Sequence, residues 1–93
     1  MIKSFSCLQT EAFFKGGKAH WLQAEVHKRA AMRLKQLAAA VEVDDLRIPP
    51  SNHLEALSGD RAGQWSIRIN LRWQVCFRFR DGDAYDVEIV DYH

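Results

Sequence analysis

The sequence has little of the residue types that mark specialised protein classes. It contains only two cysteines, too few for a disulfide framework, and Cys7 and Cys76 lack the spacing of a metal site. No apolar run approaches the ~18 residues of a membrane span, and the opening residues do not resemble a signal peptide. We therefore expect a cytoplasmic protein with no membrane contact, no bound metal and no cofactor.

An excess of charge of one sign is also missing. The net charge is only +1, so total charge does not indicate a nucleic-acid binder. Residues 1–50 carry eight Lys or Arg against five Asp or Glu, and residues 51–93 carry five against seven. Any contact with RNA must then depend on where the arginines lie. The length and the apolar fraction of 47% predict one domain over residues 1–93 with a small core.

The strongest pattern present is an alternation of apolar and polar residues in the second half. Every odd position from 67 to 79 is apolar. These positions are Ile67, Ile69, Leu71, Trp73, Val75, Phe77 and Phe79. A period of two predicts β-structure with one buried face and one open face. The open face would carry four arginines, Arg68, Arg72, Arg78 and Arg80, together with Cys76.

Turn-forming residues divide this part into strands, which we expect over residues 64–69, 73–80 and 84–90. A loop over residues 70–72 has the odd length that keeps the odd positions on one face. The last strand would bury Tyr85, Val87 and Ile89. Continuing its alternation brings Tyr92 out on the open face.

The first half predicts helices. Residues 2–5 suggest a short strand, and Thr10 is expected to cap a short helix over residues 11–15. A long helix is expected over residues 21–41, because apolar residues recur there every three or four positions. These are Leu22, Val26, Ala30, Leu34, Leu37 and Val41. The expected fold class is α+β, a small, mostly antiparallel sheet packed on one face by two N-terminal helices.

The open face and the last residues supply groups for chemistry on a phosphodiester. Arginines hold phosphates bidentately and stay charged. His93 can transfer a proton near neutral pH, Asp91 can orient an imidazole or act as a base, and Tyr92 can stack on a nucleobase. Two structural alternatives remain open, a solvated strand face for the arginines and a frayed chain end for His93. His53 has the corresponding alternative of an exposed loop histidine.

Five segments form a series along the chain, namely residues 1–5, 47–52, 57–70, 73–77 and 85–93. The last of them ends in Asp91-Tyr92-His93. In this order, the segments resemble the HigB-type toxins, a branch of the RelE/ParE superfamily, over nearly the full length. The resemblance implies a RelE-like fold and the toxin of a type II toxin–antitoxin pair. Such toxins enter the A site of the 70S ribosome and cut the messenger RNA there.

In that family the ribose 2′-OH attacks the adjacent phosphate without a metal. The resemblance implies proton transfer by Asp91 and His93, substrate orientation or stacking by Tyr92, and a phosphate contact by Arg68. Further RNA contacts are expected from His53, Arg61, Arg72, Gln74 and Arg78. The implied partner is a HigA-type helix-turn-helix antitoxin, which would make most of the contacts with operator DNA.

Some positions depart from the family pattern. Ser58 and Gln74 stand where many members have a lysine and an arginine, and losing a cation from a phosphate site can cost about 10²-fold or more. Arg72, about 7 Å from Gln74 along the strand, is a candidate replacement. Glu55 stands where some members have a catalytic histidine. Two other functions therefore stay open: a ParE-like toxin that binds DNA gyrase, or a weakly active member retained for antitoxin binding and operator autoregulation.

Overall fold

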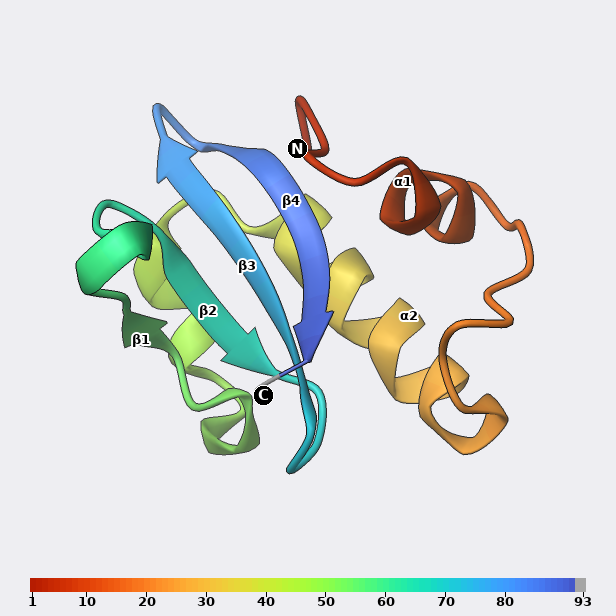
Figure 1. Ribbon diagram of the computed structural model, residues 1–93. Helices are drawn as coiled ribbons and strands as arrows, with labels where there is room; N and C mark the ends of the chain where they lie inside the picture. The colour runs from red at the N-terminus through yellow and green to blue at the C-terminus, as the bar shows by residue number, and fades with distance from the viewer. Residues whose placement is uncertain (92–93) are drawn as a thin grey trace.

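The computed structural model describes residues 1–91, which form an α+β fold. Within these residues four antiparallel strands make one sheet in the order β1-β2-β3-β4. The strands are β1 (Glu55–Ala56), β2 (Trp65–Arg68), β3 (Trp73–Arg80) and β4 (Asp83–Asp91), and the helices are α1 (Leu8–Phe14) and α2 (Ala24–Ala39). In Figure 1, α2 runs behind the sheet and α1 lies beyond β4. The expected fold class is confirmed.

Three short 3-10 helices complete the described chain. They are η1 (Val43–Arg47), η2 (Pro50–Asn52) and η3 (Gly59–Arg61). The first two connect α2 to the sheet, and the third lies between β1 and β2. The sequence predicted neither these helices nor β1, because such short elements carry no periodic pattern. No helix among residues 1–91 has the length and apolar character needed to cross a membrane.

The core lies between α2 and the sheet. The predicted apolar stripe of α2 meets the predicted apolar face of the strands, and Leu34, Leu37 and Phe77 are fully buried. Two members of these patterns are exposed instead, Val41 at 70% and Leu71 at 89%. Each lies beyond the end of its element, because α2 stops at Ala39 and Leu71 belongs to the turn between β2 and β3.

The N-terminal segment closes the outer edge of β4. Ile2 and Phe5 form isolated parallel bridges with Ala84 and Val87, in place of the expected strand. The short helix starts at Leu8, so the prediction that Thr10 caps it is wrong. Thr10 is buried, and its hydroxyl accepts a hydrogen bond of 3.0 Å from the backbone N–H of Ile89. The threonine thus ties α1 to the sheet edge.

A bulge in β4 changes which side chains face the core. The β2–β3 register pairs Ile67 with Val75, as the alternation predicts. The β3–β4 register shifts by one residue between Cys76 and Arg78, where Asp86 adopts a left-handed φ of 53°. The extra residue places Tyr85 opposite Arg78 on the open face. The prediction that Tyr85 is buried with Val87 and Ile89 is therefore wrong for the tyrosine.

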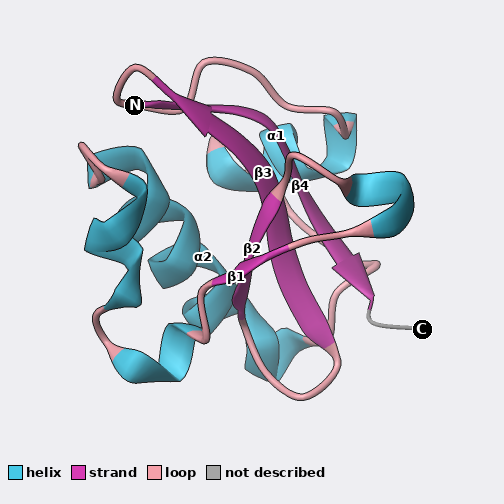
Figure 2. Ribbon diagram, turned by 90° about the vertical axis from the view of Figure 1, so that its left-hand side faces the viewer, coloured by secondary structure: helices cyan, strands magenta, loops and turns pink. Residues whose placement is uncertain are grey.

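The middle of the open face is covered. Figure 2 shows the sheet between α2 on the left and the short helix η3 on the right. Arg61 of η3 reaches across and donates hydrogen bonds to Gln64 (3.0 Å) and Glu88 (2.8 Å). Ser66 and Cys76 are buried. The expectation that Cys76 lies on an open face is wrong, because η3 and Arg61 cover that row.

The burial of Cys76 leads to a prediction about the reactivity of the two thiols. Burial raises the pKa of Cys76 to about 11, so the thiolate population at pH 8 falls by about 100-fold. We expect iodoacetamide to modify half-buried Cys7 at least ~100-fold faster than Cys76 in the folded protein. Mass spectrometry of peptides after timed alkylation measures both rates, and alkylation in urea provides the unfolded control. Equal rates in the folded state would contradict the burial.

Candidate functional site

Arg68 lies where three strands end together. The register places it beside Gln74, and Gln74 beside Val90, in one row across β2, β3 and β4. Figure 1 shows the arrowheads of β2 and β4 at the same end of the sheet. Asp91 follows Val90, so the end of β4 lies near Arg68. Tyr92 and His93, the other predicted catalytic residues, lie outside the described residues.

Arg68 also lines a hollow of about 260 Å³, together with His53, Leu54 and Glu55. His53 ends η2 in a left-handed conformation with φ 46°, and Glu55 begins β1. A guanidinium, an imidazole and a carboxylate therefore line one open hollow. Such a set can hold a phosphate and exchange a proton. The sequence did not assign Glu55 to the site, although its correspondence with a catalytic histidine of some relatives was a signal.

Arg72 has a partner within the protein. Its Nε donates a 2.8 Å hydrogen bond to Oδ2 of Asp91, and its guanidinium lies 5.1 Å from the centre of the Trp73 ring. Asp91 itself pairs across the strands with Trp73. Arg72 precedes β3 in the turn, and its ion pair directs it toward the end of β4. This geometry gives no support to Arg72 as a replacement cation beside Gln74.

The other predicted RNA-binding arginines lie away from Arg68. Arg78 forms an ion pair of 3.4 Å with Asp86 and packs against Gly63. It is four residues from Gln74 on β3, about 13 Å along the strand. Arg61 covers the row between them, and its hydrogen bond to Glu88 raises the pKa of the guanidinium. The arginines of this face therefore form separate groups.

Two arginines of α2, which sequence reasoning missed, hold the backbone at the end of β2. Arg33 donates from Nε to the carbonyl oxygen of Arg68 at 2.9 Å, and Arg29 from Nη1 to that of Ile69 at 3.4 Å. Arg33 is only 4% exposed. One sequence signal could have revealed it, because Arg33 falls within the apolar stripe of α2, between Ala30 and Leu37.

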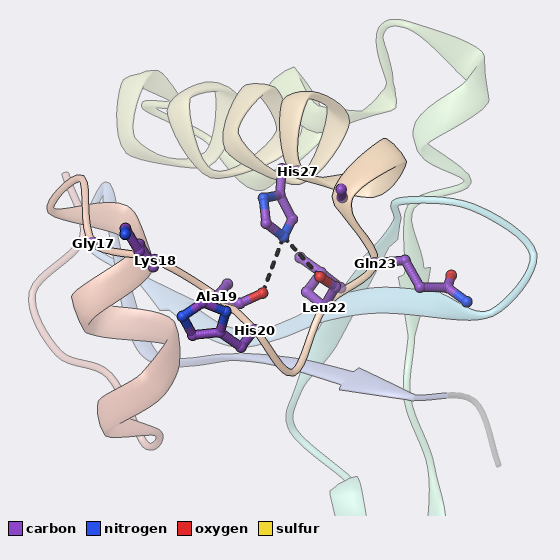
Figure 3. Close-up of a pocket in the computed structure, with 8 residues that line it drawn as sticks. Gly17, Lys18, Ala19, His20, Leu22, Gln23 and His27 are labelled. Atoms are coloured by element: carbon purple, nitrogen blue, oxygen red, sulfur yellow. Dashed lines mark hydrogen bonds between the residues drawn. The ribbon is translucent and has the colours of Figure 1, made fainter.

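A hollow of about 510 Å³ at the connection between α1 and α2 is lined by none of the predicted site residues. Figure 3 shows His27 there, with Nε2 bonded to the carbonyl oxygens of Ala19 (3.0 Å) and Leu22 (2.7 Å). Both partners accept, so Nε2 carries a proton. His27 thus holds the connection in place. Across residues 1–91 no three His, Cys, Asp or Glu side chains gather as a metal site.

Comparison with known proteins agrees with the sequence patterns. Residues 3–93 match the family described as the RelE-like toxin of the type II toxin–antitoxin system HigB. The chain is 36% identical to "Endoribonuclease HigB" of Proteus vulgaris over 93 residues, covering 100% of both chains. It is 40% identical to "Toxin HigB-1" of Vibrio cholerae over 85 residues, covering 90% of each. The chain therefore belongs to the HigB family of RelE-like toxins of type II toxin–antitoxin systems.

Proposed function

We propose that this toxin is an endoribonuclease that cuts messenger RNA in the ribosomal A site. The observation that supports this most directly is the position of Arg68, in one row with Gln74 and Val90 and beside the hollow lined by His53 and Glu55. The relative named "Endoribonuclease HigB" supports the same reaction class. The catalytic set we propose is Asp91, Tyr92, His93 and Arg68.

The proposed reaction needs only acid–base chemistry and charge stabilisation. The ribose 2′-OH loses its proton to a basic side chain and attacks the adjacent phosphorus, forming a bond from O2′ to phosphorus. The bond to O5′ breaks, and an acidic side chain protonates that oxygen. Arg68 stabilises the negative charge that grows on the phosphate. We assign the proton transfers to His93 and Asp91, and orientation of the substrate to Tyr92.

This mechanism fixes the chemistry of the products. Cleavage leaves a 2′,3′-cyclic phosphate on one fragment and a 5′-OH on the other, so the second accepts radioactive phosphate from a kinase without prior phosphatase treatment. Primer extension after brief induction should map cuts in translated messengers, and a translation inhibitor should abolish them. We expect His93→Ala to cut far more slowly. If that variant cut messengers at the wild-type rate, the assignment of the catalytic site would be wrong.

The two remaining functions give different results in the same cells. A gyrase-binding toxin would inhibit plasmid supercoiling and leave messengers intact. A weakly active member would be harmless when overexpressed and would still bind its antitoxin. We propose a HigA-type helix-turn-helix antitoxin as that partner, with operator DNA bound mainly through the antitoxin. Gel-shift assays with toxin alone and with the complex test this division of contacts.

Gln74 offers a gain-of-function prediction. It lies directly beside Arg68 in the strand register, and it stands where many family members have an arginine. A second guanidinium there would add charge stabilisation to the same phosphate, so we expect Gln74→Arg to raise the cleavage rate by about 10-fold. Timed cleavage in a translation extract measures it, with Gln9→Arg, which adds the same charge at an exposed position of α1, as the control. Equal rates for both variants would contradict the role of this position.

A further inference from the structure

A second hollow lies on the α2 side of Arg68. It has a volume of about 270 Å³ and is lined from three parts of the chain. The lining residues are Arg29, Arg33, Ser51, His53, Arg68, Ile69, Asn70 and Leu71. Three of them are arginines and none is acidic. The lining therefore has more basic than acidic side chains, and it includes Arg68, the residue that we propose binds the phosphate undergoing cleavage.

Arg33 is buried there among neutral partners. Its Nε donates to the carbonyl oxygen of Arg68, its Nη1 to Gln36 at 3.5 Å and its Nη2 to Ser51 at 3.3 Å. No ion pair found in residues 1–91 includes Arg33. A buried cation without an anion is costly to a fold. Burial lowers the pKa of Arg33, and the nearby charge of Arg29 lowers it further.

Arg29 also lines this hollow, one helical turn before Arg33 on α2. It is exposed, and its hydrogen bond to the carbonyl oxygen of Ile69 is long, at 3.4 Å. It likewise forms no ion pair with another described residue. Both arginines donate to backbone carbonyl oxygens at the end of β2, so part of their side-chain freedom is already lost before an anion binds.

We propose that this hollow binds a backbone phosphate of the RNA strand, the one next to the phosphate held at Arg68. The inference rests on the proposed endoribonuclease function. The shared residue Arg68 favours RNA over an acidic protein segment, because a strand lying on Arg68 carries its neighbouring phosphate into this hollow. Arg29, which is exposed, makes the contact with this phosphate. Arg33 holds the backbone of Arg68 in position through the hydrogen bond to its carbonyl oxygen.

The test is binding of a short single-stranded RNA to the full chain, with 2′-deoxy nucleotides throughout its centre so that it cannot be cut. We expect Arg29→Gln to weaken binding about 3- to 10-fold at low salt and to reduce the slope of log affinity against log salt by about 0.7. The matched control is Lys28→Gln, which removes the same charge from an exposed neighbour on α2. We expect it to change affinity by less than about 2-fold.

A second measurement, by NMR, detects the response of Arg29 and Arg33 to the oligonucleotide without a substitution of Arg33. The Nε–H signals of Arg29 and Arg33 in NMR spectra should shift in a saturable way as the same oligonucleotide is added. The inference would be overturned if these Nε–H signals did not change. It would also be overturned if Arg29→Gln and Lys28→Gln lost the same amount of affinity for the oligonucleotide. It would also fail if Arg29→Gln weakened binding of a poly-glutamate peptide or of ribosomes but left oligonucleotide binding unchanged.

The binding assay separates this inference from the proposed function, because it needs no cleavage. If the wild type cuts no messenger but the oligonucleotide results hold, only the endoribonuclease assignment fails. If the wild type cuts messengers and Arg29→Gln binds the oligonucleotide as tightly as Lys28→Gln, only the phosphate hollow is wrong.

Discussion

Replacing Arg68 with alanine is expected to slow messenger cleavage by about 10²- to 10³-fold, the usual cost of removing a group that stabilises transition-state charge. The side chain lies at the end of β2 between the hollow of His53 and the row that leads to β4. The substitution leaves the backbone carbonyl that accepts from Arg33, so the fold should persist. Single-turnover cleavage in a translation extract measures the effect.

Arg80→Ala is the matched control for this experiment. It removes the same charge from the same face, at the far end of β3, where Arg80 lies over the ring of Tyr85 at 4.4 Å. Its cleavage rate should stay within about 2-fold of the wild type, because charges beyond a Debye length of ~8–10 Å are largely screened. Similar losses in both variants would mean that total charge, and not the position of Arg68, determines the rate.

Phe77→Ala should produce the largest loss of stability. Phe77 is fully buried and is the largest such side chain in the described core. Replacing a buried phenylalanine with alanine costs about 3–5 kcal/mol, against a total of about 5–14 kcal/mol for a chain of this length. Urea unfolding followed by circular dichroism measures the difference, with Leu71→Ala, 89% exposed, as the control at about ±0.5 kcal/mol. Matching midpoints would contradict the core assignment.

The regular parts of this fold could be predicted from the sequence. The alternation around Val75 gave the bounds of β3 and the pairing of Ile67 with Val75, because one buried face determines both. The bulge could not be predicted. Asp86 adopts a left-handed conformation within a segment whose sequence alternates regularly between apolar and polar residues. The extra residue of the bulge turns Tyr85 to the other face of the sheet.

The candidate site shows the same division. Arg68 was identified from a strand pattern and from a family resemblance, both of which are local in sequence. Glu55, Arg29 and Arg33 were not identified, because they reach Arg68 only through tertiary packing of β1 and α2. The cover over Cys76 was missed for a related reason, since Arg61 meets Glu88 across 27 positions of sequence.

The parallel bridges of Ile2 and Phe5 to β4 bear on how other chains can attach to this protein. They occupy the outer border of the sheet, and the opposite border is β1, a strand of two residues. Among residues 1–91, neither side offers the long unpaired backbone that templates amyloid or accepts an added strand. We therefore expect a neutralising antitoxin to bind through contacts with side chains and not by adding a strand to the sheet. We also expect the free toxin to resist fibril formation.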